Sequence, residues 1–456
     1  NYLRCSNEFY LLFTHISLEF FLYKIKMDSK LMNILFMSLA FFTIFFAFQT
    51  TASLQKKILR TEHQKKHSFE NSAFTSLGIY YFVFAATCWF VPPLVAVVGP
   101  RWSLVIGTIT YLLFIVHFYH PFEWLLYSLN ITLGVGSAII YITQGNYIAR
   151  NSDDSSVTRN SGIFLSFQQA SYMISAVLLY FKYANSEEIE DMDRYIIMSV
   201  LTFICIIGLV MLFFLRLPQS NQSIDKETHN SCSAVFVTIR DNIMLLLERD
   251  MLLLIVLFFY TGLVQAFYNG VYGPAMSYTQ NLNMQPDELS FTGYILKGCG
   301  GFLGSLFFAI LGDMTIRWGR DVFMYLAGVF HLFTFIIIYL NIPNESSFGE
   351  NQAASIIDPP NFYLAIACSF LYGLGAAFYT VHIYSMLAGA FVAESTAGFG
   401  IYKFFQCLGC ALAYLYSKYA SLYIQMGILI VLLIAAVACF AIVERSVRAK
   451  QQADQP

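Results

Sequence analysis

The chain has 456 residues, of which 57 % are hydrophobic, 17 % aromatic and only 12 % charged. Soluble globular proteins carry about 25 % charged residues, so this composition excludes an ordinary soluble protein and predicts a membrane protein. The formal net charge of −2 argues against a nucleic-acid partner, because nucleic-acid-binding proteins carry a basic surface stripe.

Residues 1–26 come before Met27 and are predicted to be an upstream extension of the folded chain. Their apolar part, residues 9–23, contains Glu19 and is shorter than the roughly 20 residues that a membrane span needs. A signal peptide also fits poorly, because no small-residue cleavage site precedes Met27. The transmembrane region is therefore expected to begin after Met27.

Twelve apolar runs are long enough to cross a bilayer, on the criterion of about 17–25 mainly apolar residues. Hydrocarbon offers no hydrogen-bond partner to the backbone, so each run is expected to be a helix. The sequence therefore predicts an all-α membrane protein with twelve transmembrane helices. The runs cover residues 31–53, 74–98, 102–119, 122–148, 161–182, 194–215, 250–278, 289–312, 321–340, 361–388, 396–417 and 421–443.

The polar stretch 216–249 follows the sixth run and is the longest inside the chain. We interpret it as a cytosolic linker between an N-terminal half at 27–215 and a C-terminal half at 250–445, with a cytosolic tail at 446–456. A second polar stretch, 341–360, separates the ninth and tenth runs.

The distribution of Lys and Arg predicts the orientation of the spans, because cytosolic loops of membrane proteins carry more of these residues. With a cytosolic N-terminus, the cytosolic segments hold 16 Lys and Arg against 8 on the other side, and Lys297 and Lys403 lie within spans. Both termini are therefore predicted to be cytosolic, in either the plasma membrane or an endolysosomal membrane. The sequon at Asn344 is then a predicted glycosylation site in an outer loop.

Four short patterns of the first half recur in the same order in the second half. The offset is 216 or 217 residues ahead of the 341–360 stretch and 239 or 238 residues beyond it, so this stretch absorbs the change. Both halves start on the same side of the membrane, which predicts a parallel repeat with a binding site between the halves. The matched pairs are Gln49 with Gln265, Phe74-Thr75 with Phe291-Thr292, Gly134-x-Gly136-x-Ala138 with Gly373-x-Gly375-x-Ala377, and Gly162-Ile163-Phe164-x-x-Phe167-Gln168 with Gly400-Ile401-Tyr402-x-x-Phe405-Gln406.

The layout of twelve spans in two halves resembles the major facilitator superfamily, and several motifs resemble its unc-ninety-three-like branch over about residues 27–445. The resemblance implies a major facilitator fold. It leaves two functions open, because some relatives in this branch regulate potassium channels or assist receptor trafficking instead of transporting a solute. The motifs are Ala47-Phe48-Gln49-Thr50, Gln144-Gly145-Asn146, Asn151-Ser152-Asp153, Arg159-Asn160-Ser161-Gly162-Ile163-Phe164 and Leu371-Tyr372-Gly373-Leu374-Gly375.

Two departures from the superfamily pattern bear on function. The cytosolic signature between spans two and three is reduced to Gly99-Pro100-Arg101, and its second copy survives as Gly312-Asp313 followed by Arg317 and Arg320. Related members carry an acidic residue where this chain has Ala376. The second departure puts a proton-coupled role at that position in doubt.

Lys297 and Lys403 are the predicted centre of a solute site, because a lysine inside a span is costly and usually functional. At about 1.5 Å per residue, each lies roughly 10–12 Å from the end of its span. They can offer positive charge to an anionic solute or to a carboxylate of the protein. The alternative is that their ammonium groups reach toward the nearer membrane surface.

Polar side chains at helical spacing in spans four and seven are predicted to line the same interior, because lipid offers them no hydrogen-bond partner. The alternatives are ordinary hydrogen bonds between helices, of about 0.6 kcal/mol each, and a core position for the histidine. Gly270, Gly273 and Pro274 are expected to kink span seven and form a gate there. The candidate solute-binding residues are Gln49, Tyr141, Gln144, Gln168, Gln265, Asn269, Lys297, His382, Lys403 and Gln406.

Two charged turns on the cytosolic side are predicted to form ion-pair latches that break as the two halves rock. The alternative is that both are solvated loops, in which surface ion pairs contribute little. The candidate gate residues are Arg150, Asp153 and Arg159 between spans four and five, and Asp313, Arg317 and Arg320 between spans eight and nine.

The sequence contains no phosphate-binding glycine loop, no metal-binding histidine cluster and no Ser, His and Asp set in one soluble region. Neither a cofactor, a metal ion nor enzymatic activity is therefore expected. The leading interpretation is a multi-pass membrane protein that transports a small solute by rocking of its two halves. The alternative is a non-transporting regulatory or trafficking subunit of an ion channel or receptor.

Overall fold

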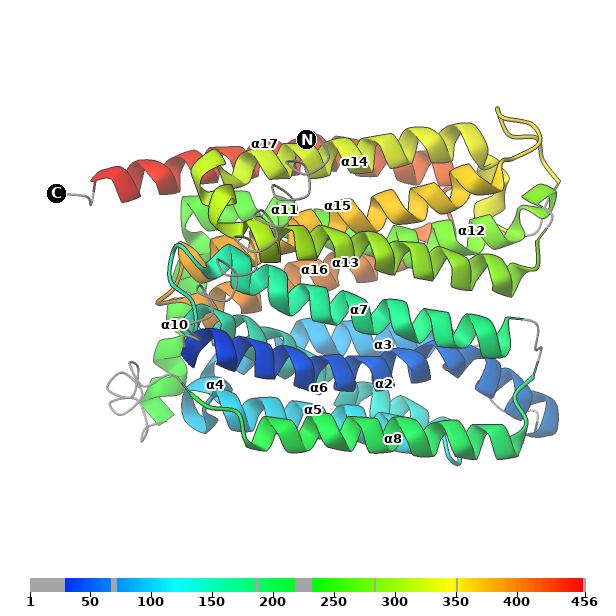
Figure 1. Cartoon of the computed structure of the whole chain (residues 1–456), viewed down its shortest axis with the longest axis horizontal. Coiled ribbons are helices and arrows are strands. Elements are labelled where there is room, and N and C mark those ends of the chain that lie inside the picture. Colours follow the sequence, from blue (N-terminus) through cyan, green and yellow to red (C-terminus); the bar gives the residue numbers. More distant parts are fainter. Residues whose placement is uncertain are drawn as a thin grey trace, which may run out of the picture.

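The structure, a computed structural model, describes residues 29–66, 72–184, 188–217, 232–282, 284–349 and 352–453 (Figure 1). The spans of the first half are α2 (Ser29–Lys66), α3 (Ser72–Thr87) with α4 (Val91–Val98), α5 (Pro100–His117), α6 (Glu123–Arg150), α7 (Val157–Tyr183) and α8 (Asp191–Phe213). Those of the second half are α11 (Arg249–Phe267) with the π-helical turn η2 (Tyr268–Tyr272) and α12 (Gly273–Tyr278), α13 (Pro286–Trp318), α14 (Arg320–Asn341), α15 (Phe362–Gly389), α16 (Ser395–Ser417) and α17 (Leu422–Ala453). Between the halves lies α10 (Cys232–Leu247), and the short 3-10 turns η3 (Gln280–Leu282) and η4 (Asn344–Ser347) follow α12 and α14.

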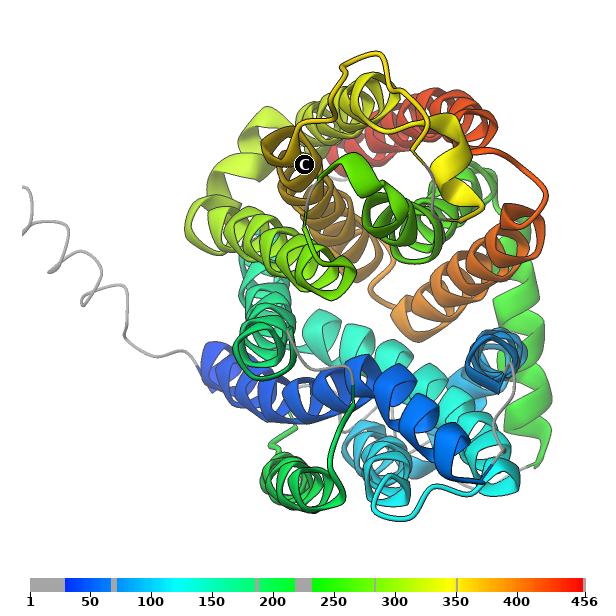
Figure 2. The ribbon, with the colours of Figure 1, turned by 90° about the vertical axis from the view of Figure 1, so that its right-hand side faces the viewer.

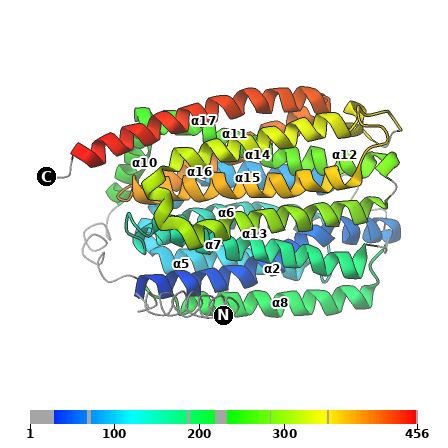
Figure 3. The same ribbon diagram turned by 45° about the horizontal axis from the view of Figure 1, so that its top comes forward.

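Among the described residues, 11 helices are long and apolar enough to cross a membrane, and the bent pair α3 and α4 makes a twelfth span. These helices lie side by side along one axis, as a bilayer requires of segments that satisfy their own backbone hydrogen bonds (Figures 1 and 3). The predicted all-α fold with twelve spans is confirmed.

Each half is built from the same set of helix pairs. In the N-terminal half, α2 packs on α7 and α8, α5 packs on α6 and α8, and α3 packs on α6. In the C-terminal half, α11 packs on α16 and α17, α14 packs on α15 and α17, and α13 packs on α15. If spans one to six are matched in order with spans seven to twelve, each helix pair of the N-terminal half corresponds to a helix pair of the C-terminal half. The parallel repeat expected from the sequence is therefore present in the fold, and Figure 2 shows the two halves as separate groups of helices.

The contacts between the halves obey the same correspondence. The principal ones join α7 with α13, α3 with α16, α6 with α16, α7 with α15, and α6 with α15. Replacing each helix by its counterpart in the other half turns the contact of α7 with α13 into that of α16 with α3. It turns the contact of α6 with α16 into that of α15 with α7, and it leaves the contact of α6 with α15 unchanged. The halves are thus related by an approximate two-fold rotation about an axis along the spans.

The glycine motif of spans four and ten makes the same contact in both halves. A Cβ on Gly134 would lie 2.9 Å from the carbonyl oxygen of Tyr80, and a Cβ on Gly373 would lie 2.0 Å from that of Lys297. Tyr80 and Lys297 are 217 residues apart, which is the offset of the repeat in spans two and eight. The first glycine of each motif therefore lets two backbones approach at equivalent positions.

Two polar groups of α2 lie beyond the predicted end of the first span. The apolar run was expected to end at residue 53, but the helix continues to Lys66. Lys57 and Glu62 on this extension are buried, and Glu62 forms an ion pair with Arg194 of α8 at 2.5 Å. Helix length outside the bilayer is set by such contacts, which hydropathy does not report.

Span two is broken into α3 and α4, where the sequence predicted one run at 74–98. The two helices meet at a bend of 61°. Pro92 and Pro93 lie in the first turn of α4 and have no backbone N–H to bond the carbonyls of the preceding turn, so the α-helical pattern of α3 cannot continue through them.

A helix also occurs within the predicted linker 216–249. Helix α10 crosses one end of the bundle and contacts α4 of the first half and α11 and α16 of the second (Figures 1 and 2). We call this end the α10 end and the opposite end of the bundle the α12 end. Residues 1–26 and 218–231 lie outside the described residues, and the limits of the halves, the linker and the tail stay predictions.

Candidate functional site

Lys403 lies at the boundary between the two halves. Its side chain on α16 is buried, and Nζ donates a hydrogen bond to Gln406 Oε1 at 2.8 Å. The ammonium group lies over two aromatic rings, with ring centroids at 4.5 Å for Tyr402 and 4.6 Å for Tyr141. Tyr141 belongs to α6, so the ammonium contacts both halves and does not point toward lipid.

Gln406 connects Lys403 to span seven. Its Nε2 donates to Thr261 Oγ1 at 3.4 Å and to Tyr402 Oη at 3.2 Å. The two helices come close here because Gly262 has no side chain, and a Cβ on it would lie 1.9 Å from the carbonyl oxygen of Gln406. The carboxamide of Gln406 is therefore bound at both of its ends.

Lys297 occupies a second interior position, inside the C-terminal half. Its Nζ on α13 donates to Asn269 Oδ1 at 2.8 Å. Three tyrosine rings surround the ammonium, at 4.9 Å for Tyr268, 5.5 Å for Tyr372 and 5.8 Å for Tyr294. Tyr268 and Tyr372 stack on each other at 4.2 Å, so spans seven, eight and ten together form an aromatic box around this cation.

The π-helical turn η2 places Asn269 beside that lysine. Pro274 has no N–H to bond the carbonyl of Gly270, and Gly273 N instead donates to Tyr268 O, five residues back. Turns of this kind are frequent at functional sites. The regular α-helical hydrogen-bond pattern is thus interrupted at these residues, while the kink of span seven and its action as a gate stay predictions.

Neither interior ammonium forms an ion pair with any carboxylate in the described ranges. A buried charge without a partner is costly, but a cation over an aromatic ring gains about 0.5–2 kcal/mol, which offsets part of that cost. Amide oxygens and ring faces therefore stabilise two positive charges in the interior without neutralising them.

The remaining candidates divide between the boundary and the individual helices. Gln144 Nε2 of α6 donates to Tyr384 Oη of α15 at 2.8 Å, which joins the halves. Gln49 instead bonds Ser53 in its own helix at 3.4 Å. Gln265 is half-buried on α11, one turn from Thr261, which accepts a hydrogen bond from Gln406.

Gln168 of α7 is buried. His382 of α15 is also buried, and it belongs to an aromatic cluster of the C-terminal half. Its ring centroid lies 4.6 Å from that of Phe308 and 5.5 Å from that of Phe323. The histidine therefore occupies the core position that was the alternative to a solute contact.

The turn between spans four and five pairs differently from the prediction. Asp153 forms an ion pair with Lys30 of α2 at 2.7 Å, and Arg159 bonds Asn160 Oδ1 at 3.3 Å. Both partners belong to the N-terminal half, and the action of this turn as a latch stays a prediction. Arg150 is half-buried at the end of α6.

Arg320 also takes a partner that the sequence did not indicate. Its Nε lies 2.8 Å from Glu444 Oε2 of α17, and its Nη1 donates to Ser385 O of α15 at 3.2 Å. Glu444 directly follows the last apolar run, 421–443. Arg317 is exposed at the end of α13, and the side chain of Asp313 lies outside the described residues.

Neutral hydrogen bonds, which the sequence did not indicate, join the halves at the α10 end. Asn146 Nδ2 of α6 donates to Ser395 Oγ of α16 at 3.1 Å. Thr158 Oγ1 of α7 lies 2.8 Å from Ser385 Oγ of α15. The halves are thus in direct contact at this end.

Charged groups join the halves at the α12 end. Lys57 of α2 forms an ion pair with Asp287 of α13 at 2.9 Å, and Tyr180 Oη of α7 donates to Glu288 Oε1 at 3.1 Å. The sequence placed Lys57 in a loop, so no signal pointed to this contact.

The predicted glycosylation site also lies at the α12 end. Asn344 Oδ1 in η4 accepts a hydrogen bond from Tyr423 N at 3.0 Å, and Ser346, the third residue of the sequon, is buried. Glycosylation of Asn344 stays a prediction.

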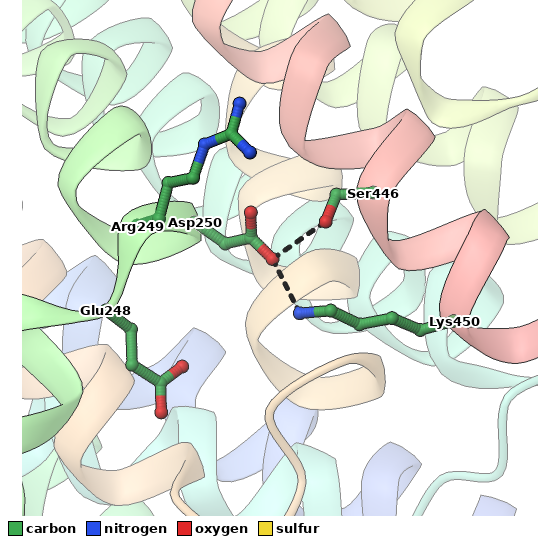
Figure 4. Close-up of a pocket in the computed structure, with 5 residues that line it drawn as sticks. All are labelled: Glu248, Arg249, Asp250, Ser446 and Lys450. Atoms are coloured by element: carbon green, nitrogen blue, oxygen red, sulfur yellow. Dashed lines mark hydrogen bonds and ion pairs between the residues drawn. The ribbon is translucent and has the colours of Figure 1, made fainter.

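A recess at the α10 end is lined by Glu248, Arg249, Asp250, Ser446 and Lys450 (Figure 4). Asp250 Oδ2 accepts hydrogen bonds from Lys450 Nζ at 2.8 Å and Ser446 Oγ at 3.0 Å, which tie α11 to α17. The interior lysines do not line this recess. Within the ranges that the structure covers, no group of three or more His, Cys, Asp or Glu could hold a metal ion.

Two halves related by rotation, with polar groups along their boundary, define the major facilitator fold. The solved structure of the human organic anion transporter MFSD10 (TETRAN) is similar, with a TM-score of 0.62 over 91 % of this chain and 100 % of that chain at 9 % identity. The chain is a multi-pass integral membrane protein of this fold.

The sequence comparisons identify the family. A family model described as "Ion channel regulatory protein UNC-93" matches residues 64–441, and the chain belongs to the UNC-93 family. UNC93-like protein MFSD11 of Xenopus tropicalis is 31 % identical over 88 % of this chain and 93 % of its own length. Protein unc-93 homolog A of Bos taurus is 23 % identical over 92 % of this chain and 94 % of its own length. The resemblance drawn from the motifs is confirmed.

Proposed function

We propose that the chain transports a small solute, which binds between the two halves and is exposed to each side of the membrane in turn. The observation that carries this proposal is the position of Lys403, a cation of the C-terminal half that rests on Tyr141 of the N-terminal half. A solute at this boundary contacts both halves, so their relative rotation changes its surroundings.

The contacts at the α10 end support this cycle. With the α10 end on the cytosolic side, as the basic residues predict, the hydrogen bonds of Asn146 and Thr158 to the opposite half close the cytosolic entrance. Neutral hydrogen bonds contribute about 0.5–1.5 kcal/mol each, so a few of them can be broken by the free energy of solute binding.

The test is an uptake screen with the full chain reconstituted in vesicles. Solutes of each charge class are offered with and without ion gradients, to the wild type, to Lys403→Ala, and to Lys418→Ala as a control with an exposed lysine near the end of the same helix. We expect uptake by the wild type and Lys418→Ala, and at least a tenfold loss in Lys403→Ala. Transport is refuted if no solute moves under any gradient.

The second candidate is a regulatory or trafficking subunit of an ion channel or receptor, and the description of the matching family favours it. Purification in a mild detergent from a native membrane tests it. A stoichiometric channel or receptor partner supports this function, and a chain that purifies alone contradicts it.

Neither candidate involves catalysis or a cofactor.

We place the chain in the plasma membrane or an endolysosomal membrane with both termini cytosolic. Epitope tags at each terminus, probed before and after selective permeabilisation, test this orientation.

A further inference from the structure

A stripe of polar side chains on span seven connects the two interior lysines. Thr261, Gln265 and Asn269 follow one another at four-residue intervals, which places them on one face of the helix. Thr261 accepts a hydrogen bond from Gln406, the partner of Lys403, whereas Asn269 accepts one from Lys297. At about 1.5 Å per residue, the two ends of the stripe are about 12 Å apart.

Gln265 lies midway along this stripe and is half-buried. Its carboxamide carries two N–H donors, at a level of the helix between the residues that contact the two lysines. The stripe therefore offers a donor between two cations.

Each ammonium group has three N–H donors, and within the described chain each gives one hydrogen bond, to an amide oxygen. The ammonium groups also lie over tyrosine rings, which carry no net charge. An amide oxygen carries no net charge, so an anion that replaces it gains a full charge interaction with the ammonium. A cationic solute at the same place is repelled by both lysines.

We infer that the interior binds a small organic anion whose carboxylate or other oxyanion takes the place of the amide oxygens of Gln406 and Asn269. Lys403 binds the anionic group at the boundary of the halves, Lys297 provides a second position within the C-terminal half, and Gln265 donates between them. The tyrosine faces beside each ammonium contact the apolar part of the solute. This inference names the solute class for the proposed transport function and rests on that function only for the movement of the anion.

The test measures binding separately from uptake. The purified full chain is heated in the presence of acetate, benzoate, succinate, phosphate, sulfate or chloride, at constant ionic strength and pH, and its midpoint of unfolding is recorded. We expect an organic carboxylate at millimolar concentration to raise the midpoint of the wild type and of Lys418→Gln. The concentration needed should rise at least tenfold in Lys403→Gln and in Lys297→Gln.

Lys403→Arg keeps the positive charge, so organic carboxylates should still raise its midpoint of unfolding. This variant tests the site even if the two neutral lysine variants unfold. Stabilisation by chloride alone, or by carboxylates equally in wild type and both neutral variants, overturns the anion site. Uptake in vesicles is measured in parallel. Anion binding without uptake overturns transport and keeps the site, whereas uptake of a neutral or cationic solute that is unaffected by the lysine substitutions overturns the site and keeps transport.

Discussion

The contact between spans eight and ten gives a sharp steric prediction. In Gly373→Ala, the new Cβ lies 2.0 Å from the carbonyl oxygen of Lys297, where ordinary contact begins at 3.4 Å. Both groups belong to backbone, so no side chain can rotate away, and α13 and α15 must separate by more than 1 Å. Overpacking of this kind costs about 1–3 kcal/mol, while alanine in a helix returns at most about 1 kcal/mol relative to glycine. We expect a net loss of about 1–2 kcal/mol.

The assay is unfolding of the detergent-solubilised chain, followed by intrinsic fluorescence against temperature and against denaturant. The control is Gly427→Ala in α17, where nothing lies within 4 Å of the added Cβ, so stability should stay the same or rise. Because the displaced carbonyl belongs to Lys297, the response to organic anions should also weaken in Gly373→Ala. Equal stability of the two variants would refute the close packing of these spans.

Three further predictions concern charged and modified groups. Glu444→Gln leaves Arg320 buried without its partner, and we expect the free energy of unfolding to fall by about 3 kcal/mol in the same assay. Asp287→Asn removes the ion pair with Lys57 at the α12 end; the carboxylate is half exposed, so stability changes by less than about 1 kcal/mol, while hydrogen exchange rises in the adjoining turns of α2 and α13. Asn344→Gln should abolish a glycosidase-sensitive mobility shift of the wild type.

Each of these has its own contradicting result. Lys450→Ala removes the exposed partner of Asp250 and should lower the free energy of unfolding by less than about 1 kcal/mol. A loss as large as that of Glu444→Gln would show that burial of an ion pair does not determine how much its removal destabilises the protein. Unchanged exchange in Asp287→Asn would show that this pair does not hold the halves together. A wild type without any glycosidase-sensitive shift would leave Asn344 unmodified.

The number and order of the spans were accessible from the sequence, because bilayer thickness and backbone hydrogen bonding constrain each of them alone. The repeat was accessible too, since glycines such as Gly134 and Gly373 are required wherever two backbones meet. The sequence also identified Lys403 and Lys297 as interior cations, because a lysine in an apolar run stands out. Their partners Tyr141 and Asn269 were named only as members of a polar set.

The contacts that the sequence did not indicate join residues that are far apart in the chain. The sequence grouped Asp153 with Arg150 and Arg159 of the same turn, but its ion-pair partner Lys30 is 123 residues away in the chain. Arg320 and Glu444 are 124 residues apart. Charge spacing along a chain favours near neighbours, whereas the packing of helices decides which opposite charge is closest. The extension of α2 that carries Lys57 was missed for a related reason, because hydropathy reports only the membrane-spanning part of a helix.

The two halves keep a common backbone arrangement but differ in charge at the positions of the proposed solute site. The repeat places Tyr80 opposite Lys297 and Leu165 opposite Lys403, so both interior cations belong to the C-terminal half. The N-terminal half contributes neutral surface there, including the ring of Tyr141 on which Lys403 rests. In the proposed transport cycle, an anion held by these lysines stays with the C-terminal half while the halves rotate. The contacts that change during the cycle are those with the N-terminal half, and substitutions of Tyr141 should alter the rate of exchange between the two sides more than the affinity for the anion.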